Sequence, residues 1–190
     1  LKGSLGERLQ ALVHVQAAMR YGNPSIAAGL AELKARGCDR IVVIPMYPQY
    51  AGSATGSVED SIARAMKKWK PAPPLRLLHD FHEHRAYVKA VARNVNDYWM
   101  KHGRPDRLVM SFHGIPKKSV DAGDPYQSQC LLSARLIAAE LGWNDHRTKV
   151  TFQSRFGAAE WLQPYTDKTL EALGKEGVGR VDVVCPGFTA

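Results

Sequence analysis

Short apolar runs alternate with segments of helical periodicity along most of this chain, and no other feature limits its fold as strongly. The apolar runs lie at 40–45, 75–78, 107–112, 148–152 and 180–185. The helical segments lie at 25–36, 58–70, 83–101, 125–141 and 166–176. Strands that alternate with helices at this spacing favour parallel sheets with helices on both faces. The sequence therefore predicts an α/β fold.

The chain divides into two halves with the same order of elements. An additional strand is predicted at 13–19, where Val13, Val15 and Ala17 alternate with polar residues. The turn-rich stretch 103–106 is the expected boundary, giving parallel-sheet domains at 1–103 and 104–190. The chain lacks an initial methionine and ends directly after a strand and its corner, so we expect an internal fragment with incomplete domains.

Charge, cysteine content and the lack of long apolar runs limit the kinds of partner and the compartment that the sequence favours. The chain has 26 Lys+Arg against 18 Asp+Glu, a formal charge of +8 that favours anionic partners such as nucleic acid, acidic lipid or a carboxylated small molecule. No basic run is interleaved with aromatic residues, which argues against nucleic acid. Three widely separated cysteines, Cys38, Cys130 and Cys185, fit a reducing compartment and contain no CxxC pair for zinc or an iron–sulfur cluster. Without a long apolar run or a signal-peptide pattern, the expectation is a cytoplasmic protein.

His113 is the first candidate functional residue. It ends the strand predicted at 107–112, and Gly114 and Pro116 then prevent a direct continuation, so that the next helix is expected from about Pro125. Ligands bind at the carboxyl ends of strands in open α/β sheets. A neutral imidazole there can bind a metal or accept a proton near neutral pH. The alternative is a structural histidine bonded to a backbone carbonyl.

The other strand-end corners are aromatic and rich in hydroxyl groups. These corners lie at 20–24, 47–56, 153–157 and 186–189 and include Tyr21, Tyr47, Tyr50, Phe156 and Phe188. Trp161 lies in a loop between a strand and a helix. Such rings suit a flat apolar ligand, or they simply pack on the sheet edge.

Two further patterns are weaker. The glycine-bounded turn 52–56 opens a helix and could hold a phosphate or carboxylate, but it lacks the P-loop lysine, so Thr55 or Ser57 as a helix N-cap is favoured. His79, His82 and His84, with Asp80 and Glu83, form a candidate metal cluster. Residues two apart share a face on a strand and diverge on a helix, so this cluster depends on the local conformation.

Read together and in order, six motifs resemble ferrochelatase. They are Tyr47–Tyr50 followed by Ser53 and Thr55–Gly56, then Ser111–Pro116, Gly123–Tyr126, Phe152–Gly157, Trp161–Leu162 and Pro186–Ala190. The resemblance spans nearly the whole chain. It implies two Rossmann-like, chelatase-type domains around a porphyrin cleft, and an enzyme that inserts ferrous iron into protoporphyrin IX in the last step of haem biosynthesis.

The resemblance also assigns roles to residues. His113 matches the active-site histidine, a metal ligand or proton acceptor, while Tyr47, Arg64, Trp161 and Phe188 match positions near the porphyrin or its cleft. Iron is then a substrate, with no permanently bound cofactor. The acidic partner of the histidine is expected after residue 190, and the opening strand of the first domain before residue 1. Ala65 stands where some relatives carry an aromatic residue.

Other functions stay open at this point. A related chelatase could act on another tetrapyrrole, such as sirohydrochlorin with cobalt or iron. The truncated chain could instead bind porphyrin or haem without turnover, or, from the 52–56 turn alone, a phosphosugar or nucleotide. Peripheral membrane contact and the oligomeric state are also left open.

Overall fold

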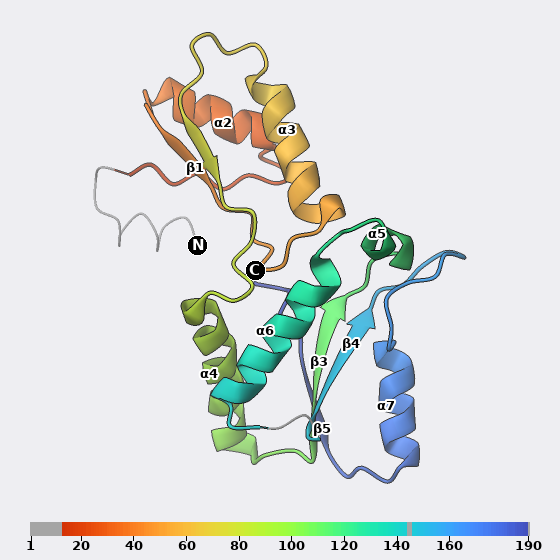
Figure 1. Cartoon of the computed structure of the whole chain (residues 1–190). Helices are drawn as coiled ribbons and strands as arrows, with labels where there is room; N and C mark the ends of the chain where they lie inside the picture. Colours follow the sequence, from red (N-terminus) through yellow and green to blue (C-terminus); the bar gives the residue numbers. More distant parts are fainter. Residues whose placement is uncertain (1–12, 144–145, 190) are drawn as a thin grey trace. The chain divides into compact units, whose positions relative to one another are not determined.

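The structure is a computed structural model that describes residues 13–143 and 146–189. Ala190 of the last motif, and the first twelve residues of the predicted first domain, lie outside the described residues. The chain forms two compact units, and Figure 1 labels most of their elements. One unit comprises the residues up to Pro45 together with Gly52–His79, and the other comprises Met46–Ala51 together with Asp80–Ala190.

The first unit is built on two parallel strands, β1 (Ile41–Val43) and β2 (Leu75–Leu77), with Ile41 opposite Leu75. In the described part of this unit, the helices α2 (Ile26–Ala35) and α3 (Ser57–Met66) accompany the strands. A π-helical turn, η1 (Gly52–Gly56), leads into α3. The core of this unit consists of buried aliphatic residues from both helices and β1, namely Leu30, Ile41, Val58 and Ile62.

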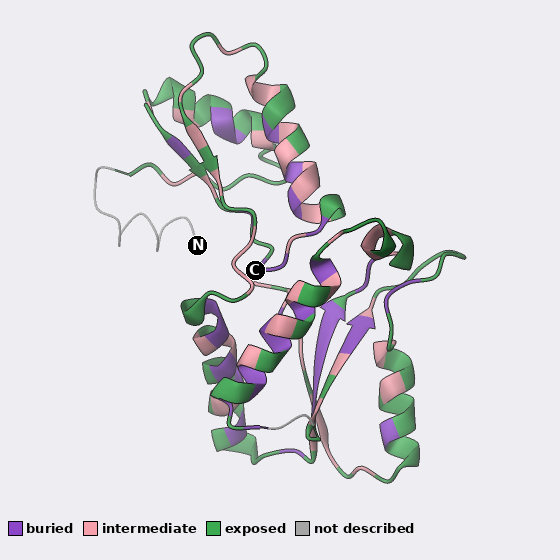
Figure 2. Cartoon of the chain, viewed as in Figure 1, coloured by how far each residue is buried: buried purple, intermediate pink, exposed green. Residues whose placement is uncertain are grey.

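The second unit is built on three parallel strands in the order β4–β3–β5, with bounds Arg107–His113 for β3, Thr148–Gln153 for β4 and Val181–Val184 for β5. The central strand β3 is buried from Leu108 to Phe112. Figure 2 shows this burial along β3, whereas most of α7 is exposed. The continuous apolar run at 108–110 thus becomes a strand covered on both faces, as parallel sheets require.

Four helices surround this sheet: α4 (Arg85–His102), α5 (Lys117–Asp121), α6 (Tyr126–Glu140) and α7 (Thr166–Lys175). Helix α4 packs on α6, and α7 packs along β4. At the end of α4 the Trp99 ring stacks on Trp143 with 4.6 Å between centroids. Gly103 follows with a φ of +80°, a conformation that favours glycine at a helix end.

The observed division differs from the predicted domains 1–103 and 104–190. Helix α4 lies before the predicted boundary but belongs to the second unit, because its buried side chains, from Tyr87 to Trp99, pack there. The short segment Met46–Ala51 also belongs to the second unit. A helix's apolar periodicity indicates that one face is buried, and it does not indicate which sheet covers that face.

Most predicted elements agree with the structure to within a few residues, and three local predictions were wrong. Residues 13–18 form no strand, since only an isolated bridge between Met19 and Ser25 occurs there. A short helix, α5, begins at Lys117, well before Pro125. The start of α3 has no side-chain cap, because the helical backbone already begins in η1.

No helix within the described ranges combines the length and apolar character needed to cross a bilayer.

Candidate functional site

His113 is the last residue of β3, where the central strand of the second unit ends, and its side chain is exposed. Its Nδ1 lies 2.7 Å from the carbonyl oxygen of Gly114. A carbonyl only accepts hydrogen bonds, so Nδ1 carries the hydrogen and Nε2 keeps its lone pair in the neutral ring. The histidine is therefore bonded to a backbone carbonyl, and this bond leaves Nε2 suited to accept a proton or bind a metal.

The backbone around His113 is held by its neighbours. The Tyr126 hydroxyl donates to the His113 carbonyl at 2.8 Å, and the Gly114 amide donates to the Gln153 carbonyl at 2.8 Å. A Cβ on Gly114 would lie 3.0 Å from that Gln153 oxygen and 3.1 Å from Cε3 of Trp161. Glycine thus permits β4 and the Trp161 loop to approach the strand end closely.

Aromatic rings surround the imidazole. The rings of Trp161 and Phe188 each lie 6.3 Å from His113 between centroids, and Phe156 lies 4.9 Å from Trp161. Trp161 is buried, whereas the side chains of Phe156 and Phe188 are 74% and 53% exposed. We call His113, Phe156, Trp161 and Phe188 the aromatic cluster. It offers a flat organic molecule stacking partners beside a basic nitrogen.

The corner Pro186–Thr189, which carries Phe188, is bonded to other segments at both ends. The Tyr87 hydroxyl donates to the Pro186 carbonyl at 3.0 Å, and the Thr189 hydroxyl donates to the Met46 carbonyl at 2.8 Å. Tyr47, which is 39% exposed, directly follows Met46. The second unit therefore contains four of the five predicted site residues: Tyr47, His113, Trp161 and Phe188.

Arg64, the fifth, belongs to the first unit and lies exposed on α3. Its guanidinium donates to the Ser61 hydroxyl on the same helix at 3.2 Å. No ion pair of Arg64 occurs within the part of the chain that the structure describes.

The candidate metal cluster at 79–84 separates into three local interactions. His79 pairs with Glu59 at 2.7 Å, His82 pairs with Asp80 at 2.6 Å, and His84 accepts from the Ala86 amide at the start of α4. Over residues 13–143 and 146–189, no group of three or more His, Cys, Asp or Glu side chains is arranged to hold a metal. The structure therefore does not support a metal site there.

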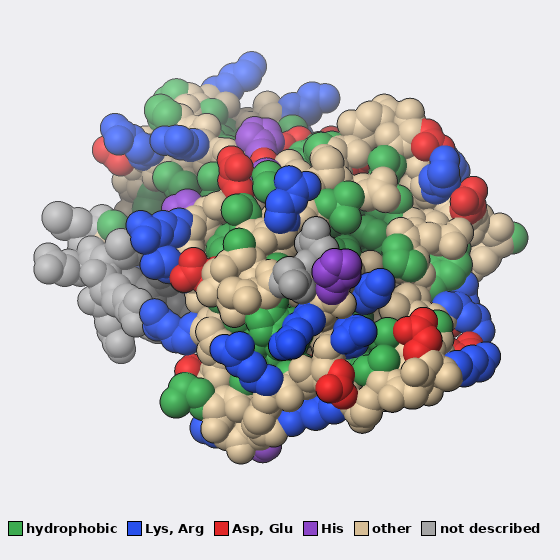
Figure 3. All heavy atoms as spheres, turned by 60° about the horizontal axis from the view of Figure 1, so that its bottom comes forward, with side chains coloured by type: hydrophobic (Ala, Val, Ile, Leu, Met, Phe, Trp, Pro, Cys, Tyr) green, Lys and Arg blue, Asp and Glu red, His purple; other side chains and the backbone are tan. Residues whose placement is uncertain are grey.

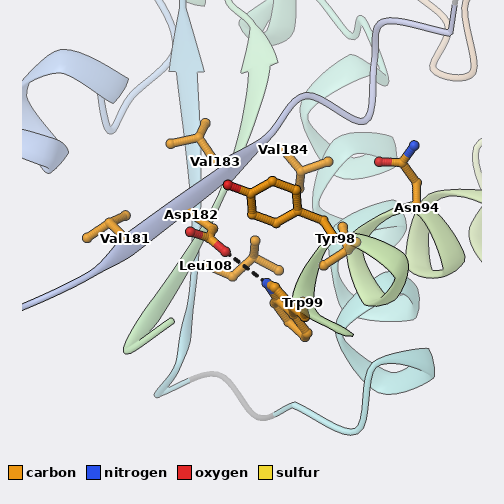
Figure 4. A pocket seen from close by; sticks show the side chains of 9 residues that line it. Asn94, Tyr98, Trp99, Leu108, Val181, Asp182, Val183 and Val184 are labelled. Atoms are coloured by element: carbon orange, nitrogen blue, oxygen red, sulfur yellow. Dashed lines mark hydrogen bonds between the residues drawn. The ribbon is translucent and has the colours of Figure 1, made fainter. Parts of the chain in front are cut away.

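A pocket of about 320 Å³ lies elsewhere in the second unit, between α4 and β5 (Figure 4). Its charged residue, Asp182, accepts from Trp99 Nε1 at 2.9 Å and from Nε and Nη2 of Arg180, each at 3.1 Å. The carboxylate is thus already occupied by protein donors. None of the predicted site residues lines this pocket.

On the face of the molecule drawn in Figure 3, lysine and arginine side chains occur at many places. Figure 3 shows lysine and arginine side chains spread over the displayed face, with acidic side chains between them. The net charge of +8 therefore supports general attraction of anions and does not by itself locate a binding site.

Sequence reasoning missed three residues whose hydrogen bonds support the backbone around the site: Gln49, Tyr87 and Tyr126. Gln49 and Tyr126 do lie within the Tyr47–Tyr50 and Gly123–Tyr126 motifs, which was the available signal. Tyr87 lies 99 residues from its partner Pro186, and Tyr126 lies 13 residues from His113 in a different element, so no local pattern could identify the bonds.

The comparison with protein families decides the relationship. The family model described as ferrochelatase matches residues 1–190. The chain belongs to the ferrochelatase family. Among curated relatives, the ferrochelatase of Aromatoleum aromaticum is 56% identical over 190 residues, which is all of this chain and 52% of that protein. The ferrochelatase of an Azoarcus species is 53% identical over 178 residues, 94% of this chain and 49% of that protein.

The chain thus spans about half the length of the curated relatives it matches. Among solved structures, it is similar to SirB from Bacillus subtilis with Fe3+, at a TM-score of 0.69, 17% identity, and coverage of 94% of this chain and 65% of that one. The sirohydrochlorin chelatase SirB in complex with cobalt gives a TM-score of 0.63 at 16% identity, covering 96% of this chain and 77% of that one. These similarities confirm the predicted α/β chelatase-type fold with two parallel sheets.

Proposed function

We propose that this chain acts, within the protein at its natural length, as a ferrochelatase that inserts ferrous iron into protoporphyrin IX, the last step of haem biosynthesis. Membership of the family supports this activity. The observation that carries it at the site is the His113 imidazole, whose Nδ1 is bonded to the Gly114 carbonyl and whose ring lies 6.3 Å from the rings of Trp161 and Phe188 between centroids. A planar tetrapyrrole needs a basic nitrogen to accept its pyrrole protons and an aromatic surface on which to stack.

The reaction defines what His113 has to do. Free porphyrin carries two pyrrole N–H protons, and both must leave as iron enters and bonds to the four nitrogens. A neutral imidazole near pH 7 can accept one of these protons at Nε2, or can bind the incoming iron. The second proton needs a second acceptor, such as a carboxylate or a water molecule. In this proposal iron is a substrate, and the chain holds no permanent cofactor.

The aromatic residues would bind the macrocycle. Phe188 and Trp161, whose rings each lie 6.3 Å from His113 between centroids, would line the porphyrin site, with Phe188 offering most of the exposed ring surface, and Tyr47 would extend it. Rigid walls of this kind can hold the ring in a bent shape that exposes its nitrogens to the metal. Arg64 is proposed as a substrate-binding residue from the family resemblance alone. We also propose a cytoplasmic location.

The test is His113→Ala in the protein at its natural length. We expect iron insertion to fall about a hundredfold to ten-thousandfold, the range for loss of a general base, while porphyrin binding changes little. Stability should be nearly unchanged, because His113 is exposed and its side-chain hydrogen bond joins it only to the next residue. His146→Ala, at an exposed histidine just before β4, is the matched control.

Retained turnover in His113→Ala would remove this residue from the mechanism. Two further assays separate the alternatives. Porphyrin binding without metal insertion in the unsubstituted protein would favour a binding module, and faster insertion of cobalt or iron into sirohydrochlorin than into protoporphyrin would favour a chelatase for another tetrapyrrole.

A further inference from the structure

Gln49, in the segment Met46–Ala51, carries a buried amide that is hydrogen-bonded to helices α4 and α6. Its side chain is 2% exposed. Its Nε2 donates to the Tyr87 hydroxyl at 3.2 Å and to the Ser133 hydroxyl at 2.9 Å. Both hydrogens of the amide are therefore used, one toward α4 and one toward α6.

Each hydroxyl passes its own hydrogen to a backbone carbonyl. Tyr87 donates to Pro186 at 3.0 Å, and Ser133 donates to His82 at 2.7 Å. The direction of both arms is fixed, because the amide nitrogen only donates and the carbonyls only accept. Burial raises the pKa of Tyr87 to about 12, so its hydroxyl keeps the hydrogen that this arrangement needs.

The hydrogen bond from Tyr87 ends on Pro186, in the corner that carries Phe188. Pro186 is buried and lies two residues before Phe188. A Cβ on Gly187 would lie 3.5 Å from Gln49 Oε1 and 3.7 Å from Phe112 Cδ1, so the corner lies directly against these side chains. The Phe188 ring itself is 53% exposed. Its place beside His113 therefore depends mainly on the backbone that carries it.

We propose that Tyr87 is a positioning residue for porphyrin binding. Oriented by Gln49, its hydroxyl holds the Pro186 carbonyl and thereby keeps the Phe188 ring at its 6.3 Å distance from His113. This inference rests on the proposed function and deepens it, since it names a residue that acts on the porphyrin through another. Ser133 serves as the comparison, because it is also buried and its hydroxyl donates to the His82 carbonyl rather than to the corner that carries Phe188.

The experiment compares Tyr87→Phe with Ser133→Ala in the protein at its natural length. For Tyr87→Phe we expect the KM for porphyrin to rise roughly tenfold, the scale of one lost buried hydrogen bond. The pH profile of kcat should not change, since His113 is untouched. For Ser133→Ala we expect a comparable loss of stability and an unchanged KM for porphyrin.

A second readout needs no substrate. The Phe188 amide donates to the Cys185 carbonyl at 3.2 Å, so its hydrogen exchange reports on the corner. Exchange should be faster in Tyr87→Phe and unchanged in Ser133→Ala. If Tyr87→Phe does not fold, Phe188→Ala still tests the idea, because an unchanged KM in that variant would mean that the ring has no binding role to be positioned for.

The double variant gives the sharpest test. If Tyr87 acts through Phe188, adding Tyr87→Phe to Phe188→Ala should raise the KM no further. Independent, multiplying effects would overturn the proposal, as would equal KM increases in Tyr87→Phe and Ser133→Ala. Absence of porphyrin binding in the unsubstituted protein would instead refute the proposed function. Normal binding there, with the same KM in Tyr87→Phe, would refute only the positioning role.

Discussion

Replacing Gln49 with glutamate should reverse the direction of its hydrogen bonds to Tyr87 and Ser133 without changing the shape of the side chain. A carboxylate has no hydrogen to donate, so the hydroxyls of Tyr87 and Ser133 would turn to donate to it. The carbonyls of Pro186 and His82 would then lose their hydrogen-bond partners. Gln49→Glu is therefore a change of two donors into two acceptors at a position that is 2% exposed.

The structure sets the size of the effect. Leaving one buried carbonyl without its partner costs roughly 1–3 kcal/mol. A protonated carboxyl still donates one hydrogen, so at acid pH one arm is lost and the free energy of unfolding falls by roughly 2 kcal/mol. The ionised form loses both arms and is also buried, which brings the loss to roughly 5 kcal/mol.

The difference of roughly 3 kcal/mol corresponds to a pKa raised by about two units, since one unit equals about 1.4 kcal/mol. The introduced carboxyl would then titrate near about pH 6.5 in the folded protein and near about pH 4.3 in the unfolded chain. A raised folded pKa favours the neutral form. Below the unfolded pKa, Gln49→Glu therefore lowers the free energy of unfolding by the smaller amount. This loss of stability grows as the pH rises through the folded pKa.

Urea unfolding followed by tryptophan fluorescence, at about pH 4.5 and about pH 8, measures this difference. Gln49→Met is the matched control, because it removes both donors without adding a titratable group and should cost the same at both pH values. An equal loss for Gln49→Glu at acid and alkaline pH would contradict the donor direction argued from the structure.

Two further predictions concern stability. Gly114→Ala should lower the free energy of unfolding by roughly 1–3 kcal/mol, because its Cβ would meet the Gln153 carbonyl and Trp161 at 3.0 and 3.1 Å; thermal denaturation that matches the unsubstituted protein would show that both neighbours can shift freely. Burial raises the pKa of Tyr87 to about 12 and the pKa of Tyr126 as well. Both groups are favoured in their neutral form by folding, so their stabilisation is complete below about pH 10 and is lost as the pH rises through the folded pKa values. An ultraviolet titration of tyrosinate should accordingly coincide with alkaline unfolding, and Tyr87→Phe should weaken that pH dependence.

Local chemistry in the sequence was enough to predict most of the strands, helices and corners. Glycine and proline at 114 and 116 placed His113 at a strand end, and the structure has it there. The strand at 13–19 was wrong because alternation of apolar residues needs a neighbouring strand, and the described chain offers only the bridge from Met19 to Ser25.

Hydrogen bonds between residues far apart in the sequence could not be predicted from local patterns. Gln49 lies 38 residues from Tyr87, and Tyr87 lies 99 residues from Pro186, so their hydrogen bonds depend on how complete elements pack. The membership of α4 in the second unit has the same origin, because an apolar face says that a helix is covered without saying by what. The strand end that carries His113 could therefore be predicted from sequence, whereas the hydrogen bonds that hold the segments around it could not.

The division of the chain also bears on how pieces of it can be produced. Met46–Ala51 belongs to the second unit although the first unit supplies the residues before and after it. No single cleavage of the polypeptide can therefore release either unit whole, and an expression boundary at Gly103 would sever α4 from α6, the helix on which it packs. Fragment design should keep α4 with the later part of the chain and supply the Gln49 segment separately, for example as a synthetic peptide.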